Sequence, residues 1–214
     1  MALYHFESLH GAAKQIRLLT LIPAAFGSEV CIMLERIELG RANPPDYEAL
    51  SYVWGSTLAP DSVQILLSKK QGQDGARILN VTKNLSSALQ HLRYETRPRV
   101  MWIDAICIDQ SNLKERSDQV ALMSDIYQLA QRVVVWLGPE TPNSSTALNV
   151  MERLGSNISV DWNLETMTIA PISAEVPSNA HECVTKQTAL LSSKTLGYIW
   201  DLLKRPWFER LWIR

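Results

Sequence analysis

The chain has 214 residues, of which 46% are hydrophobic and 20% charged, a composition typical of a globular protein with a buried core. Its formal net charge of −1 excludes the strongly basic surface that nucleic-acid-binding proteins present. No apolar run approaches the ~20 residues needed to span a bilayer. The three cysteines (Cys31, Cys107 and Cys183) are odd in number and lack metal-ligand spacing, which indicates a reducing, cytoplasmic compartment and no metal site.

The N-terminal region, residues 1–46, is expected to form a lead-in followed by a β-hairpin that packs on the rest of the chain. Residues 1–13 carry little pattern. Gln15–Leu21 and Glu29–Glu38 are rich in apolar and β-branched residues, and a stretch containing proline and glycine separates them. This pattern predicts two paired strands, and the prolines at 44 and 45 end the region.

A buried strand and a second hairpin follow. Ala49–Trp54 reads as a short buried strand that Gly55 stops. Ser62–Ser68 and Ala76–Val81 flank a glycine-rich polar turn, which predicts a hairpin. Thr82 is expected to cap the next helix, whose apolar residues recur at helical spacing, namely Leu85, Ala88, Leu89 and Leu92.

The segment 100–138 predicts a strand, a helix and another strand. Val100–Ile106 is apolar nearly throughout, as in a strand covered on both faces, and Val133–Leu137 reads in the same way. Between them a polar turn provides Ser111 or Asn112 as the N-cap of a helix from about 114 to 132. The inner face of that helix is expected to carry Val120, Met123, Ile126, Tyr127 and Ala130.

The C-terminal part is less regular. Ser145–Leu154, capped by Asn143 or Ser144, and Thr188–Leu203 are predicted helices, whereas residues 156–184 read as a long loop with at most one short helix. The final ten residues, RPWFERLWIR, concentrate aromatic side chains that need packing partners. We therefore expect the chain to be the N-terminal part of a longer protein, ending at or just before the end of its domain.

Alternating strands and helices predict an α/β fold with a mainly parallel sheet. The three parallel strands are expected at Ala49–Trp54, Val100–Ile106 and Val133–Leu137. Sheets of this kind bind ligands at the carboxyl ends of their strands, so the residues there are the candidates for a site. The chain contains no glycine-rich phosphate loop and no dinucleotide-binding fingerprint.

Asp104 and Cys107 are the first candidates, because each is a reactive residue type within or just after an apolar strand. A carboxylate there is costly unless it is paired. Asp104 is therefore either a ligand contact or general base, or an acceptor of backbone or tryptophan N–H bonds that holds the loop. Cys107 is either a nucleophile or a buried thiol, and no histidine is close to it in sequence.

Further candidates follow the first two strands. Asp109 and Gln110 precede a helix, where they either cap it or contact a phosphate-bearing ligand. Tyr52 and Trp54 share one face of their strand, and Ser51 takes the other. The aromatic pair either lines the core or, with Gly55, stacks on a planar ligand.

The helix after the strand carries a polar group of residues on adjacent turns: Glu115, Arg116 and Gln119. They form either an outward ion-pair stripe or a surface that faces a partner or ligand. Most tryptophans are expected in the core, including Trp102, Trp136, Trp207 and Trp212.

Four blocks in order resemble the heterokaryon incompatibility (HET) domain of filamentous fungi. They are YEALSYVWG (47–55), VTKNLSSALQHLR (81–93), the run from Trp102 to Gly138 that begins WIDAICIDQ, and RPWFERLWIR (205–214). The IRLL motif at 16–19 also resembles the family's lead-in. On this resemblance residues 47–214 are the domain itself, and its motif positions in the later blocks include Trp136, Gly138, Pro206, Trp207, Arg210 and Trp212.

The resemblance implies an intracellular module that triggers cell death when incompatible fungi fuse, often within a protein that carries further domains. It also implies a distant relation to Toll/interleukin-1-receptor (TIR) domains, with a flavodoxin-like sheet. Some TIR relatives cleave NAD with a glutamate near the end of the domain. Members of the resembled family usually continue the last block with Gln-Glu, which is absent here, and Glu209 is the nearest acidic residue.

Two functions are therefore expected. The first is a death-signalling module that self-associates and acts with other signalling proteins or fused domains. The second is an NAD-hydrolysing enzyme, with NAD as substrate, a site near Tyr52, Trp54, Asp104 and Asp109, and a catalytic glutamate at or beyond the chain end. Within this chain Glu209 and Asp104 are the weak catalytic candidates, and no other cofactor is indicated.

Overall fold

The computed structural model describes residues 2–9, 14–41, 44–67, 75–156, 158–161, 166–169 and 192–210. Contacts divide the chain into two compact units, residues 1–138 and 139–214, which we describe separately. Among the helices in these ranges, none combines the length and the hydropathy that a membrane crossing requires.

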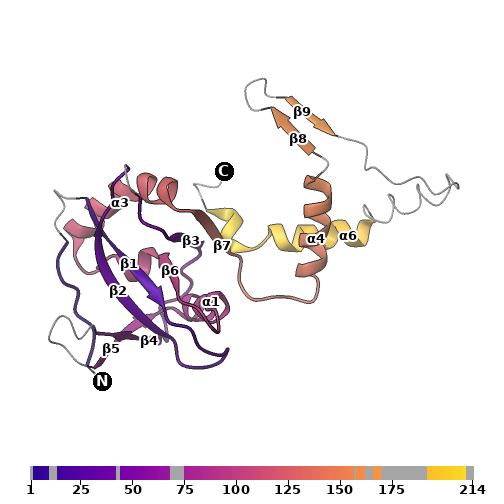
Figure 1. Cartoon of the computed structure of the whole chain (residues 1–214). Helices are drawn as coiled ribbons and strands as arrows, with labels where there is room; N and C mark the ends of the chain where they lie inside the picture. The colour runs from indigo at the N-terminus through magenta and orange to yellow at the C-terminus, as the bar shows by residue number, and fades with distance from the viewer. Residues whose placement is uncertain are drawn as a thin grey trace, which may run out of the picture. The chain divides into compact units, whose positions relative to one another are not determined.

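A seven-stranded sheet forms the first unit (Figure 1), in the order β5-β4-β2-β1-β6-β3-β7. Three strand pairs are parallel (β2 with β4, and β3 with both β6 and β7) and three are antiparallel, so the sheet is mixed. The strands are β1 Gln15–Leu21, β2 Cys31–Glu38, β3 Glu48–Tyr52, β4 Asp61–Leu66, β5 Ala76–Val81, β6 Arg99–Trp102 and β7 Arg132–Trp136.

The predicted pairings are confirmed where the chain has clear turns. β1 and β2 form the first hairpin, and β4 and β5 form the second. The three strands expected to be parallel, β3, β6 and β7, are parallel neighbours. Both hairpins belong to the same sheet as these strands, because β1 pairs with β6.

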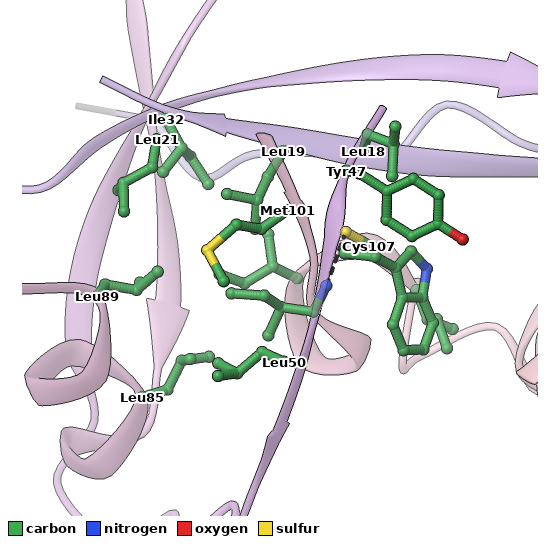
Figure 2. Close-up of a cluster of buried hydrophobic side chains, with 14 of the residues drawn as sticks. Leu18, Leu19, Leu21, Ile32, Tyr47, Leu50, Leu85, Leu89, Met101 and Cys107 are labelled. Carbon is green, nitrogen blue, oxygen red and sulfur yellow. Dashed lines mark hydrogen bonds between the residues drawn. The ribbon is translucent and has the colours of Figure 1, made fainter. Parts of the chain in front are cut away.

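Helices α1 (Lys83–Leu92) and α3 (Leu113–Leu129) cover opposite faces of the sheet. Met101 and Trp102 are consecutive in β6 and therefore point to opposite sides. Figure 2 shows Met101 on the side of Leu85 and Leu89 of α1. The Trp102 ring instead meets that of Tyr127 of α3, with centroids 5.7 Å apart.

The caps of both helices agree with the sequence pattern. The Thr82 hydroxyl accepts a hydrogen bond from the Leu85 N–H, and Asn112 accepts one from the Glu115 N–H. Such bonds satisfy backbone donors that the first helical turn leaves free. The inner face of α3 differs from the prediction, since Ile126 is buried but Val120 is 56% exposed.

The strand predicted at Val100–Ile106 is too long, because β6 ends at Trp102. The short helix α2, Asp104–Cys107, follows with Ile103 at its N-cap. Ile103, Ile106 and Ile108 are all buried. An apolar run that stays buried has the same composition in a strand and in a short helix, so composition alone misassigned Asp104 to the strand.

The amino ends of β3, β6 and β7 are joined by ion pairs. Glu48 accepts from Arg99 at 2.5 Å and from Arg132 at 2.6 Å, and these three residues lie at the starts of the three strands. β7 is the outermost strand of this side of the sheet. Val133 and Val135 are 44% and 41% exposed, so the prediction of a fully buried third strand is wrong.

The second unit contains α4 (Ser144–Gly155), the antiparallel hairpin of β8 (Ile158–Asp161) and β9 (Thr166–Ile169), α6 (Ser193–Leu203) and a 3₁₀ helix, η3 (Pro206–Glu209). The two helices were predicted, but the hairpin replaces part of the expected loop at 156–184. The remainder of that predicted loop lies outside the described residues. Arg205 ties the unit together by donating to Pro139 O and Ser144 Oγ.

Candidate functional site

Three parallel strands end at one edge of the sheet and bring the candidate residues together there. β3 ends at Tyr52, β6 at Trp102 and β7 at Trp136. Ser51 and Tyr52 are buried within the strand, whereas Trp54 beyond it is 38% exposed. We call this region, with Trp54, Asp104, Asn84 and Trp136, the carboxyl edge.

Trp54 and Asp104 meet directly. The Trp54 indole N–H donates to Asp104 Oδ2 at 2.8 Å, and the Ala105 N–H donates to Asp104 Oδ1 at 2.7 Å. The Gln110 side chain donates to the Asp104 carbonyl at 2.9 Å. Both carboxylate oxygens therefore accept bonds that hold the segment after β6, which supports the structural alternative for Asp104.

Asn84, which the sequence prediction missed, joins two of the strand ends. Its amide nitrogen donates to Val53 O, and its amide oxygen accepts from the Trp136 indole N–H at 3.0 Å. Asn84 is in the first turn of α1, where asparagine is a weak helix former. That local mismatch is the only signal in the sequence that points to this residue.

Gly55 lies against Asn84 and has a φ of +77°. A Cβ atom at Gly55 would come within 3.3 Å of Asn84 Cβ. Glycine is therefore favoured at this position by both backbone conformation and space. Its role in the fold is conformational, and the ligand stacking considered from the sequence stays a prediction.

An aromatic row continues from Trp136 along α1. The rings of Trp136 and His91 have centroids 5.1 Å apart, and those of His91 and Phe26 are 5.0 Å apart. His91 Nδ1 lies 2.8 Å from Ser87 O, so this nitrogen carries the proton. Phe26 is 65% exposed, and neither it nor His91 was expected near the site.

Cys107 is fully buried, which argues against the nucleophile alternative. Its sulfur accepts a hydrogen bond from the Ile103 N–H at 3.4 Å (Figure 2). Burial raises the pKa of the thiol to about 12. A thiol with this pKa stays protonated at neutral pH and is a poor nucleophile.

Glu115 was expected on the outer face of its helix, but it is buried and paired with Arg17 of β1. The two Arg17 Nη atoms donate to the two carboxylate oxygens at 2.6 and 3.0 Å. Arg17 also donates to Cys107 O at 2.9 Å, and the Asp109 N–H donates to Glu115 Oε1 at 2.7 Å. This pair fixes the segment that follows β6 to β1 and α3.

The rest of the predicted polar stripe divides between the interior and the surface. Gln119 is buried and donates to Gln15 O at 2.8 Å, while Arg116 is exposed as expected. The Asp109 carboxylate accepts from both the N–H and the hydroxyl of Ser111, at 3.0 and 2.6 Å. Asp109 therefore stabilises the turn before α3, although Asn112 is the residue that caps the helix.

The remaining candidates lie in the second unit and at its boundary with the first. Glu209 is exposed at the end of η3, where Pro206 is the first residue. Trp207 is half-buried and packs edge-on against Phe208, with ring centroids 5.1 Å apart. Arg210 is half-buried, and Trp212 lies outside the described residues. Gly138, which ends the first unit, has a φ of +102°.

Hollows of about 910 and 660 Å³ lie away from the carboxyl edge. The larger is lined by residues 3–7 and by parts of β1, β2, β4 and β5. The smaller lies beside Ser8, Leu9 and the start of α3. Among the described residues, no group of three or more histidine, cysteine or acidic side chains is arranged to hold a metal ion.

Comparisons with known proteins give two matches. The profile of the family described as heterokaryon incompatibility protein (HET) matches residues 47–214. The chain is also 30% identical, over 231 aligned positions, to heterokaryon incompatibility protein 6, OR allele, of Neurospora crassa. The alignment covers 98% of this chain but 32% of that relative, so the chain spans about a third of its length. No solved structure matches, and the flavodoxin- or TIR-like assignment stays a prediction.

Proposed function

Because this chain belongs to the heterokaryon incompatibility (HET) family, we propose that it is a fungal incompatibility module that promotes cell death by associating with further copies of itself. The observation that carries the proposal is the family match over residues 47–214, supported by similarity along nearly the whole chain to an incompatibility protein.

The contacts at the carboxyl edge support this assignment, because they connect the blocks on which the family resemblance rests. Trp54 of the first block bonds to Asp104 of the third. Asn84 of the second block bonds to Val53 of the first and Trp136 of the third. The blocks thus act together as one structural framework.

Self-association is supported by the chemistry of the same region. The carboxylate of Asp104 accepts bonds from Trp54 and from the Ala105 N–H, and the thiol of Cys107 is buried and protonated at neutral pH. β7 is the last strand on this side of the sheet that the described residues form, and an edge strand of this kind can pair with a strand of another chain. These features favour a binding surface over a reaction centre.

The proposal is tested by inducing expression of the protein in a filamentous fungus and counting dead cells with a vital dye. Induction is expected to kill cells, and light scattering of the purified protein is expected to show a mass that rises with concentration. A folded Asn84→Ala variant with weakened contacts between the blocks is expected to kill fewer cells. Survival of cells that accumulate folded wild-type protein would contradict the proposal.

The alternative is hydrolysis of NAD. One observation favours it: half-exposed Trp54 lies beside Asp104 at the edge where parallel sheets bind ligands. If it holds, purified protein consumes NAD, and Asp104→Asn or Glu209→Gln lowers the rate by about 10²–10⁴-fold, as expected for loss of a general acid or base. If folded protein does not consume NAD, this alternative is contradicted, while the proposed cell-death function is unaffected.

A further inference from the structure

The first residues of the chain extend the sheet at its other edge. Leu3 pairs in parallel with Ile78 of β5, the outermost strand there. The Tyr4 N–H donates to Ile78 O at 2.8 Å, and the Ile78 N–H donates to Ala2 O at 3.0 Å. Figure 1 shows the start of the chain beside β5. The segment is therefore bound by strand addition, a common mode of peptide recognition.

Two arginines of the sheet hold the residues that follow. Arg17 donates to Glu7 O, and its guanidinium lies 4.9 Å from the centre of the Phe6 ring. Arg36 pairs with the Glu7 carboxylate at 2.7 Å. Residues 2–8, which we call the N-terminal segment, are thus recognised through their backbone and through two side chains. The β5 edge at Ile78, Arg17 and Arg36 together form what we call the β5 groove.

The N-terminal segment is loosely packed against the rest of the domain. Hollows of about 910 and 660 Å³ flank it. Leu3 is 56% exposed, and Tyr4 is the residue of the segment that packs partly buried against the core. Backbone bonds, one half-exposed ion pair and the contact of Arg17 with the Phe6 ring hold the rest. Contacts of this kind are weak enough for one copy of a peptide to be replaced by another.

We propose that the β5 groove is a peptide-binding site and that its exchange partner is the N-terminal segment of a second copy of this chain. Every copy carries the sequence that fits the groove, so exchange reproduces each contact between different molecules. The partner's segment would also reach Arg17, which contacts Cys107 and Glu115. The exchange gives the proposed self-association a specific contact. Its biological role rests on that proposed function.

Binding to the groove is tested with a fluorescent peptide of residues 2–8. The protein carries Phe6→Ala and Glu7→Ala, which weaken its own segment and leave the groove intact. Fluorescence anisotropy is expected to show binding about tenfold tighter than to the wild-type chain, where the segment competes. A peptide with Glu7→Lys is expected to bind the double variant about tenfold more weakly, and Arg36→Glu in the protein to reverse this preference.

Exchange between copies is tested by complementation. One partner is the Phe6→Ala/Glu7→Ala variant, with an intact groove, and the other is Arg36→Glu, with an intact segment. Mixing is expected to produce a 1:1 heterodimer in light scattering, at concentrations where neither variant associates alone. Circular dichroism first establishes that each variant is folded, and Glu7→Ala alone replaces the double variant if that one unfolds.

If the folded double variant fails to bind the peptide, the β5 groove is not a peptide-binding site. If the peptide binds but the two variants form no heterodimer, the occupant of the β5 groove is not the segment of a second copy. Both measurements use purified protein, so their failure is distinct from failure of the cell-death test. If a folded Arg36→Glu variant still kills cells, the β5 groove is not needed for the proposed function, and its proposed biological role is wrong.

Discussion

At the scale of single residues, the main result is that the charged groups near the site hold the fold. Arg17 and Glu115 are both buried, and their bidentate pair uses both carboxylate oxygens. A buried charge is costly unless it is paired and hydrogen-bonded, and here each partner has further backbone contacts. The pair therefore matters chiefly because neither member tolerates loss of the other.

Arg17→Met is expected to lower the free energy of unfolding by about 3–5 kcal/mol, because Glu115 would remain as an unpaired buried carboxylate. Urea denaturation measures the change. Arg41→Met serves as the matched control, because Arg41 and its partner Asp125 form an exposed pair, and its effect is expected to be small by comparison. Equal losses in the two variants would contradict the structural weight given to the buried pair.

Cys107 yields a prediction for the dependence of stability on pH. Burial raises its pKa from 9.0 to about 12, so the folded protein keeps a proton that the unfolded chain loses at lower pH. Its contribution to stability is complete below pH 9 and is lost as the pH rises toward 12. Between pH 9 and 10.5, wild-type protein is expected to lose more stability than Cys107→Ala does. If wild-type protein and Cys107→Ala lost equal stability over this pH range, burial of the thiol would be contradicted.

At the scale of elements, the turns that follow the strands position the site. Gly55 adopts a positive φ beyond β3 and leaves room for Asn84, which bonds to Val53. Asp104 and Glu115 restrain the short helix and loop after β6. The carboxyl edge therefore depends on local backbone conformations as well as on the sheet itself.

Gly55→Ala is expected to destabilise the domain by about 1–2 kcal/mol, because an alanine at positive φ is strained and its Cβ crowds Asn84. Thermal unfolding followed by circular dichroism measures this. Gly40→Ala provides the control, since no atom lies within 4 Å of an added Cβ and no positive φ is present there. If Gly55→Ala were no less stable than the control, the tight turn would not be required.

The sequence predicted elements well where periodicity and turn residues agree. Both hairpins, the helix after Thr82 and the cap at Asn112 follow from such local patterns. The prediction of element boundaries failed where a segment is buried in both a strand and the helix that follows it. The run after Met101 is apolar except for Asp104, so its hydrophobic pattern does not mark the change from β6 to α2 at Ile103.

The contacts of the site were less predictable, because the partners are far apart in the chain. Glu115 has a charged side chain at a helical position, which predicts exposure unless the partner is known. That partner, Arg17, is 98 positions away. Asn84 likewise meets Trp136 across 52 positions. Pairs that were nominated in advance and then found in contact include Trp54 with Asp104, Gln110 with Asp104, and Asp109 with Glu115.

At the scale of the whole molecule, the main core belongs to the first unit. Among the residues that the structure describes, the buried hydrophobic cluster runs from β1 to α3, and Ile126 is its last buried member. The family match includes the second unit as well, because it extends to residue 214. Folding and function are thus expected to have different sequence requirements.

A fragment of residues 1–138 is therefore expected to unfold in one cooperative transition on heating, since it contains the whole sheet and its core. It is expected to lack killing activity in the expression assay. Differential scanning calorimetry checks the first expectation. A broad, non-cooperative signal would mean that residues 139–214 are needed for the sheet to form.

The most direct test of the account compares Asp104→Asn with Asp104→Leu in the cell-death assay. Asparagine removes the charge but keeps one of the two acceptor oxygens, enough for the bond from Trp54 without the bond from the Ala105 N–H, while leucine removes both acceptors. A structural Asp104 predicts that asparagine retains killing and leucine loses it. Loss of killing by a folded asparagine variant, to the extent of about 10²–10⁴-fold seen for missing acid–base groups, would contradict this and make Asp104 catalytic.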